Sequence, residues 1–68
     1  GIKLTATSDQ MIFQGVVLST NGAYGMNIAN ANCDDNVLVG VIAAGNVTAS
    51  IQDSGTGTLK STTVNKLP

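Results

Sequence analysis

Short runs of apolar and β-branched residues alternate with polar turn residues along the whole chain. Five runs predict β-strands, at residues 2–5, 11–19, 25–29, 37–44 and 50–53, and a weaker sixth run follows at 59–65. Each run is bounded by Asn, Asp, Gly or Ser, the residues that turns favour. No segment keeps a 3.6-residue apolar period between capping residues. The pattern therefore predicts an all-β protein.

The chain resembles itself when it is shifted by 25 residues, so that predicted strands fall on strands and turns on turns. The identical pairs are Asp9 with Asp34, Gly15 with Gly40, Val16 with Val41 and Asn21 with Asn46. The apolar pairs include Phe13 with Leu38 and Val17 with Ile42. In a partial third copy, Thr62 and Val64 fall on Val37 and Val39; at an offset of 24, Ile2 and Leu4 fall on Met26 and Ile28.

A repeat of this length predicts a β-solenoid, because the chain can circle once per repeat and pair in parallel with the preceding coil. We expect a single right-handed parallel β-helix segment over residues 1–68, with about two to three coils. One coil spans 9–33, the next spans 34–58, and partial coils lie at both ends.

In a β-solenoid, equivalent residues of successive coils stack in columns along its axis. The sequence predicts a role for several of these columns. The pairs Phe13/Leu38, Val16/Val41 and Leu18/Ala43 are expected to fill the inside as an apolar stack. Glycine inside a strand marks a bend, so Gly15 and Gly40 predict a corner between two sheets. Asn21 and Asn46 are expected at another corner, where stacked amides hydrogen-bond along the column.

Apolar residues are also expected on the outer surface, because the long strands do not alternate cleanly. The outward positions are Ile12, Val17, Val37, Val39 and Ile42. A sheet with two apolar faces is buried on both, so another subunit is expected to cover this surface.

A small antiparallel β-sandwich or barrel is the alternative fold, since many short strands also suit that class. It predicts hairpins with two-residue turns, and Asn21-Gly22 is one such turn signal.

Composition narrows the means of stabilising so short a chain. With 68 residues, a single cysteine (Cys33) and no histidine, the sequence offers neither an internal disulfide nor a Cys/His zinc site, and we expect no metal and no cofactor. The net charge is −1 without arginine, so neither nucleic-acid nor polyanion binding is indicated. The longest apolar run, at 37–44, is too short to span a bilayer. The remaining ways to stabilise so short a chain are oligomerisation, as a trimer or by end-to-end stacking, and membership of a longer β-helix.

Two segments resemble repeats of a known superfamily. They are residues 32–40, with Asp34-Asp35 before an apolar strand and Gly40, and residues 45–58, with Gly45-Asn46 and the final run from Ile51 to Thr58. Together they are similar to the last coils of pectate-lyase-like right-handed parallel β-helices, which include polysaccharide lyases, glycoside hydrolases, epimerases and phage tailspike depolymerases. The chain departs from this family at Val41, where a buried Asn is common, which argues against an amide ladder in that column.

The resemblance implies that acidic residues on the outside could act on or bind a polysaccharide. The candidates are Asp9, Asp34 and Asp35, with Tyr24 as a sugar-stacking platform, although turn aspartates usually cap strand ends and a lone tyrosine usually packs on a neighbour. Cys33 has no histidine to activate it and predicts a small buried role. Asn46-Val47-Thr48 matches a glycosylation acceptor. The Gly-rich run 54–58 predicts a turn rather than a phosphate-binding loop, because no helix is predicted after it.

The absence of a local acid/base set favours a structural segment of an extracellular or virion assembly, such as a phage tailspike, with no complete active site and no catalytic residue. The alternative is the terminal part of a polysaccharide lyase or glycoside hydrolase.

Overall fold

The computed structural model describes residues 1–67, which form seven short strands and no helix. The strands are β1 (Ile2–Leu4), β2 (Ile12–Gln14), β3 (Val17–Ser19), β4 (Tyr24–Ile28), β5 (Val37–Val39), β6 (Ile42–Ala44) and β7 (Ala49–Asp53). They make three small sheets, with the strand orders β1-β4-β7, β2-β5 and β3-β6. The prediction of an all-β chain is confirmed.

Every strand pair within these sheets is parallel, and the register follows the predicted offsets. Ile2 lies opposite Met26 at an offset of 24. The other pairs have an offset of 25, as in Phe13 with Leu38 and Leu18 with Ala43. The antiparallel alternative is wrong, because the chain does not fold back at Asn21-Gly22. It continues instead from β3 into β4, a strand of a different sheet.

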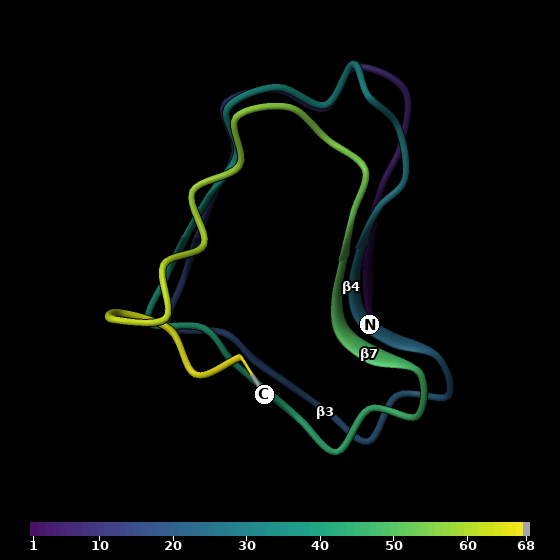
Figure 1. Ribbon diagram of the computed structural model, residues 1–68, viewed down its shortest axis with the longest axis vertical. Helices are drawn as coiled ribbons and strands as arrows, with labels where there is room; N and C mark the ends of the chain where they lie inside the picture. Colours follow the sequence, from purple (N-terminus) through teal and green to yellow (C-terminus); the bar gives the residue numbers. More distant parts are fainter. Residues whose placement is uncertain (68) are drawn as a thin grey trace.

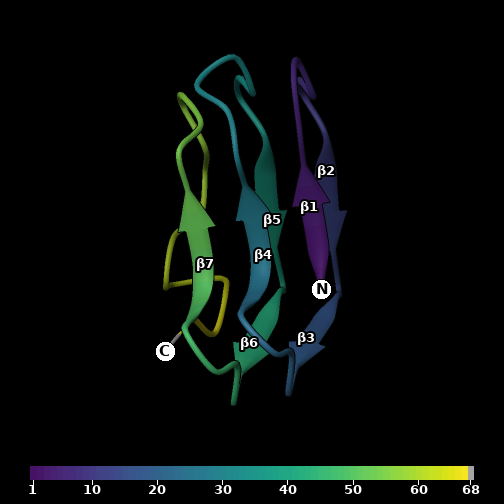
Figure 2. The same ribbon diagram turned by 90° about the vertical axis from the view of Figure 1, so that its right-hand side faces the viewer.

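Successive passes of the chain follow the same path around a common interior (Figure 1). Turned by 90°, the strands of each sheet lie side by side as layers, with β1, β2 and β3 at one end and β7 at the other (Figure 2). The first two passes each contribute one strand to every sheet, and the third pass contributes β7 to the β1-β4-β7 sheet.

Left-handed backbone conformations, apart from the one at Ala6, recur in register between passes and mark the corners. Gly15 and Gly40 have φ angles of 64° and 66°, which confirms the predicted corner and explains why the runs 11–19 and 37–44 are each split into two strands. Two further columns have positive φ: Gln10, Asp35 and Gly57 form one, and Thr20 and Gly45 form the other. Only Gly15 and Gly40 were predictable, because the other two columns include residues that rarely adopt this conformation.

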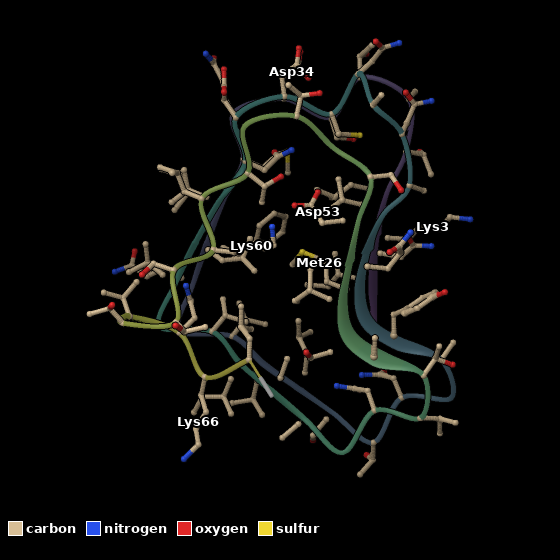
Figure 3. All side chains as sticks on the ribbon, in the orientation of Figure 1. Lys3, Met26, Asp34, Asp53, Lys60 and Lys66 are labelled. Atoms are coloured by element: carbon tan, nitrogen blue, oxygen red, sulfur yellow. The ribbon has the colours of Figure 1, made fainter. Side chains whose placement is uncertain are left out.

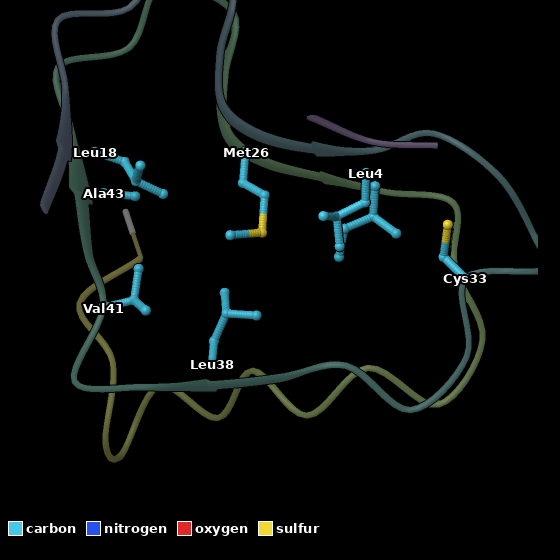
Figure 4. Packing of buried hydrophobic residues seen from close by; sticks show 8 residues of the cluster. Leu4, Leu18, Met26, Cys33, Leu38, Val41 and Ala43 are labelled. Atoms are coloured by element: carbon cyan, nitrogen blue, oxygen red, sulfur yellow. The ribbon is translucent and has the colours of Figure 1, made fainter. Parts of the chain in front are cut away.

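The core lies between the three sheets, where apolar side chains from all of them meet (Figure 4). Leu38, Val41 and Ala43 are almost fully buried, whereas their column partners Phe13 and Val16 are partly buried and pack against the same cluster. The predicted inner columns are therefore confirmed. Within residues 1–67, the second pass of the chain lies between two others.

The third pass follows a different register from the predicted one. Leu59, not Thr62, lies beside Val37, at an offset of 22. The turn after β7 causes the shift, because Asp53 to Thr56 spans three residues whereas the equivalent Ile28 to Asp34 spans six. The predicted placement of Thr62 and Val64 on Val37 and Val39 is wrong, and the run 59–65 contributes isolated bridges rather than a strand.

Gly40→Ala should lower the free energy of unfolding by about 1–2 kcal/mol, because alanine must adopt a left-handed φ at this corner. A Cβ there would come no closer than 3.6 Å to Gly15, so the effect reports the backbone conformation rather than a clash. Gly22→Ala is the matched control: its Cβ would meet open space and its φ is not positive. Equal midpoints of urea unfolding for the two variants would contradict the assigned corner.

Candidate interaction surfaces

Inward asparagines follow the corner residues and bind the preceding coil. Asn36 accepts a hydrogen bond from the backbone N–H of Met11 at 3.0 Å, and Asn46 accepts one from Asn21 N at 3.0 Å. The Asn46 amide also accepts from Asn21 Nδ2 at 2.8 Å and donates to the Leu18 carbonyl at 2.9 Å. The predicted Asn21/Asn46 amide contact is confirmed. Asn36, which is fully buried, was missed because the first coil has Met11 in that column.

A buried asparagine, Asn65, also occupies the Val16/Val41 column, in the third pass of the chain. Asn65 accepts from Val41 N at 2.9 Å and donates to the Leu38 carbonyl at 2.7 Å. The 25-residue offset does not bring Asn65 to Val41, because the register of the third pass is shifted. The column therefore holds one amide rather than a ladder.

The interior of the third pass carries an ion pair. Asp53 lies in the column of Ile28, and Lys60 follows Leu59, the partner of Val37. Both side chains point inward (Figure 3), and Lys60 Nζ lies 2.8 Å from Asp53 Oδ2. The 25-residue repeat does not predict this pair, because only the shortened turn after β7 brings the two residues into line with the core.

The Asp53 carboxylate also closes that turn. Its Oδ1 accepts from Gly55 N at 2.9 Å and from Thr58 Oγ1 at 3.1 Å. Burial alone would raise the pKa of Asp53, but the hydrogen bonds from Lys60, Gly55 and Thr58 and the Lys60 charge together lower it below its usual value.

The predicted carboxylate candidates lie on exposed turns. Asp9 Oδ1 accepts from Asp34 N at 3.0 Å, which joins two successive coils at this edge. Asp35 has a left-handed backbone with φ of 57° and donates its backbone N–H to the Thr56 carbonyl. The structure thus brings the three residues to one edge, where Asp9 and Asp35 make contacts between coils.

The two remaining candidate residues, Tyr24 and Cys33, are partly and fully buried, respectively. Tyr24 is partly buried at the start of β4, opposite Ala49. Cys33 is fully buried, and its Sγ lies 3.4 Å from the Ala6 carbonyl, as expected for a small turn-lining residue.

The Gly-rich run 54–58 packs against the second coil. A Cβ at Gly55 would approach the Cys33 carbonyl to 2.6 Å and Ile28 Cγ2 to 2.8 Å, so only glycine fits. The Gly55 N–H is already bonded to Asp53, so it is not free to bind a phosphate.

Apolar side chains are exposed on the outer faces of the β2-β5 and β3-β6 sheets, which we call the lateral face. Ile12 and Val17 are 69% and 65% exposed, and Val39 and Ile42 are exposed as well, whereas Val37 is partly buried. The outer column of the third sheet is polar, with Lys3, Asn27 and Gln52 in register. Four of the five predicted outward positions are therefore exposed, and the fifth, Val37, is partly buried.

Asn46→Ala should lower the free energy of unfolding by about 2–3 kcal/mol, because it removes three hydrogen bonds between coils. Asn32→Ala, at an exposed turn position, is the control and should change stability by less than about 0.5 kcal/mol. Chemical denaturation followed by circular dichroism measures both. A loss at position 46 no larger than the loss at position 32 would show that the amide contributes nothing.

Stability should fall as the pH drops below about 4, because a carboxylate with a lowered pKa in the folded state stabilises the fold only while it is ionised. Asp53→Asn should be less stable than the wild type at pH 7 and should lose less stability on acidification. Asp34→Asn, which removes an exposed carboxylate, is the control. Thermal unfolding between pH 2.5 and 7 checks this, and parallel curves for wild type and Asp53→Asn would refute it.

Residues 1–67 form no pocket and bring together no group of three metal-ligating side chains. In the same range, no helix is long and apolar enough to cross a membrane. Comparison with known protein families, with curated proteins and with solved structures found no match.

Proposed function

We propose that the chain is a structural segment of a right-handed parallel β-helix of the pectate-lyase-like type, within a larger extracellular or virion assembly such as a phage tailspike. The parallel pairing of strands at offsets of 24 and 25 residues carries this proposal. Corners and inward asparagines that recur at the same offset support it.

The lateral face supports a role within an assembly. Four exposed apolar side chains, Ile12, Val17, Val39 and Ile42, lie on two adjacent sheets of a chain whose third sheet is polar outside. Exposed apolar groups in contact with water are unfavourable, and neighbouring ones mark a surface that another protein covers. The neighbour is a second subunit of the same assembly, as in a homotrimer.

A structural role fits the acidic residues better than catalysis does. Asp9 bonds the next coil through its side chain, and Asp53 is held by Lys60 and two further donors. A glycosidase acid/base pair needs two carboxyl groups that face a bound sugar across a site. A role as the terminal part of a polysaccharide lyase or glycoside hydrolase is therefore the weaker alternative for this chain.

Val39→Lys/Ile42→Lys should reduce the particle mass measured by size-exclusion chromatography with light scattering, because two charges on the lateral face oppose its burial. Asn27→Lys/Gln52→Lys places the same charges on the polar sheet and should leave the mass unchanged. Circular dichroism verifies that both variants are folded. A wild-type chain that is a stable, well-folded monomer would overturn the proposal.

A further inference from the structure

The tripeptide Asn46-Val47-Thr48 matches the acceptor motif for N-linked glycans, and its asparagine joins the first two passes of the chain. We infer that a glycan on Asn46 and the stacked fold exclude each other. The folded chain is closed to glycosylation at this site, and a chain that is glycosylated before it folds cannot stack its passes. The inference goes beyond the proposed function and does not depend on it, because it rests only on contacts between residues 18–25 and 46–49.

Both polar atoms of the Asn46 amide are engaged in bonds to the preceding pass. Its Oδ1 accepts from Asn21 N at 3.0 Å and from Asn21 Nδ2 at 2.8 Å. Its Nδ2, the atom that would carry a glycan, donates to the Leu18 carbonyl at 2.9 Å. The reactive nitrogen of the acceptor motif is therefore part of the contact between passes.

The surroundings of Asn46 Nδ2 leave no room for a sugar. Gly25 is buried beside this nitrogen, and a Cβ at Gly25 would lie 2.9 Å from Asn46 Nδ2 and 3.2 Å from Leu18 Cβ. A space too small for one further carbon cannot hold a sugar ring. A glycan could be accommodated only if the Asn46 side chain left the corner, which would break all three of its hydrogen bonds.

The backbone of the acceptor motif is also held by the preceding pass. Val47 N donates to the Asn21 carbonyl at 3.1 Å, and Thr48 N donates to the Ala23 carbonyl at 2.8 Å. A glycan transferase must draw the acceptor segment into its own active site, which these bonds oppose. The side chains of Val47 and Thr48 are exposed, so the motif lies on the surface while its reactive nitrogen is withheld.

The chemistry of transfer shows why the exclusion acts in both directions. Transfer forms a bond between Asn46 Nδ2 and the anomeric carbon of a lipid-linked oligosaccharide. The bond between that carbon and the pyrophosphate of the lipid carrier breaks, the pyrophosphate leaves with the carrier, and Nδ2 loses one proton. In an unfolded chain Nδ2 is free to react. In the stack, the bulky product would leave the Leu18 carbonyl and the Asn21 amide without their partner, which is costly for groups away from water.

The exclusion restricts the route by which the chain can reach an extracellular location. A secretory route that transfers glycans to nascent chains would divide the protein into an unmodified form that folds and a glycosylated form that does not. A route without such a transferase delivers all of the protein in the folded form.

The direct test places one sugar on a chosen asparagine by chemical synthesis, which is practical for a chain of 68 residues. N-acetylglucosamine is attached to Asn46 or, as the control, to Asn30. Asn30 is exposed, its Oδ1 accepts from Asn32 N at 2.9 Å, and within residues 1–67 its Nδ2 has no hydrogen-bond partner. The Asn30 glycoform should have the circular dichroism and urea midpoint of the unmodified chain. The unfolded fraction of the Asn46 glycoform should be at least about tenfold larger, because three hydrogen bonds between passes are lost.

A second measurement follows the enzymatic reaction, with a purified oligosaccharyltransferase and a lipid-linked oligosaccharide. The variant Thr48→Ala/Asn32→Thr removes the motif at Asn46 and gives exposed Asn30 an acceptor motif instead. The folded wild type should be modified at least about tenfold more slowly than this folded variant, since reaction at Asn46 requires the open chain. Peptides of residues 43–51 and 27–35 with the same motifs have no stack and correct for the intrinsic strength of the two acceptors.

Two results would overturn the inference. The first is an Asn46 glycoform that unfolds at the same urea concentration as the Asn30 glycoform. The second is equal rates of enzymatic modification for the two folded chains, relative to their peptides. Neither result bears on the lateral face, which is tested by the particle mass of Val39→Lys/Ile42→Lys, so this inference and the proposed function can fail separately.

Discussion

The fold depends on how the chain satisfies backbone N–H groups that follow three of the left-handed corner residues, Gln10, Thr20 and Gly40. A left-handed residue turns the strand, and the next N–H points along the stack toward the following coil. At Met11, Asn21 and Val41 this donor is bonded by a side-chain amide from the next pass. A buried donor without a partner costs as much as a lost hydrogen bond, so these three positions each need an asparagine in the pass that follows.

This constraint explains why both turns and core keep a common register. The amides of Asn36 and Asn46 accept hydrogen bonds from Met11 and Asn21, each 25 residues earlier, which is also the offset of the apolar columns. A shift of one residue would remove the amide contacts and also move Leu38 and Ala43 out of the interior. Polar pairing and apolar packing therefore specify the same alignment, which is how a small core obtains a unique structure.

The repeat itself could be predicted from the sequence, and so could the details that are duplicated in it. Gly15 with Gly40 indicated a corner, Asn21 with Asn46 indicated an amide contact, and Ile2 with Met26 indicated the offset of 24. The corner at Thr20 could not be predicted, because a β-branched residue rarely has a positive φ and adopts it here in register with Gly45.

The third pass could not be predicted because its register changes twice. The short turn held by Asp53 moves the chain forward by three residues, and this brings Lys60 opposite the core. Between Leu59 and Lys66 the chain then uses two more residues than between Val37 and Ile42. Neither change can be detected when the chain is aligned with itself. The Asp53–Lys60 ion pair and the buried Asn65 were therefore not predictable from the sequence.

The extra residues of the third pass form a turn that projects from the side of the stack (Figure 1). Ser61 closes this turn through its own carbonyl, which accepts from Asn65 N at 3.1 Å and from Asn65 Nδ2 at 3.0 Å. The chain thus leaves the stack at Ser61 and returns at Asn65, which also bonds Val41 and Leu38 of the preceding pass. Residues inserted at the tip of this turn, between Thr62 and Thr63, leave the bonds of Val64 and Asn65 to the second pass in place, so a longer loop could be added there by evolution or by design.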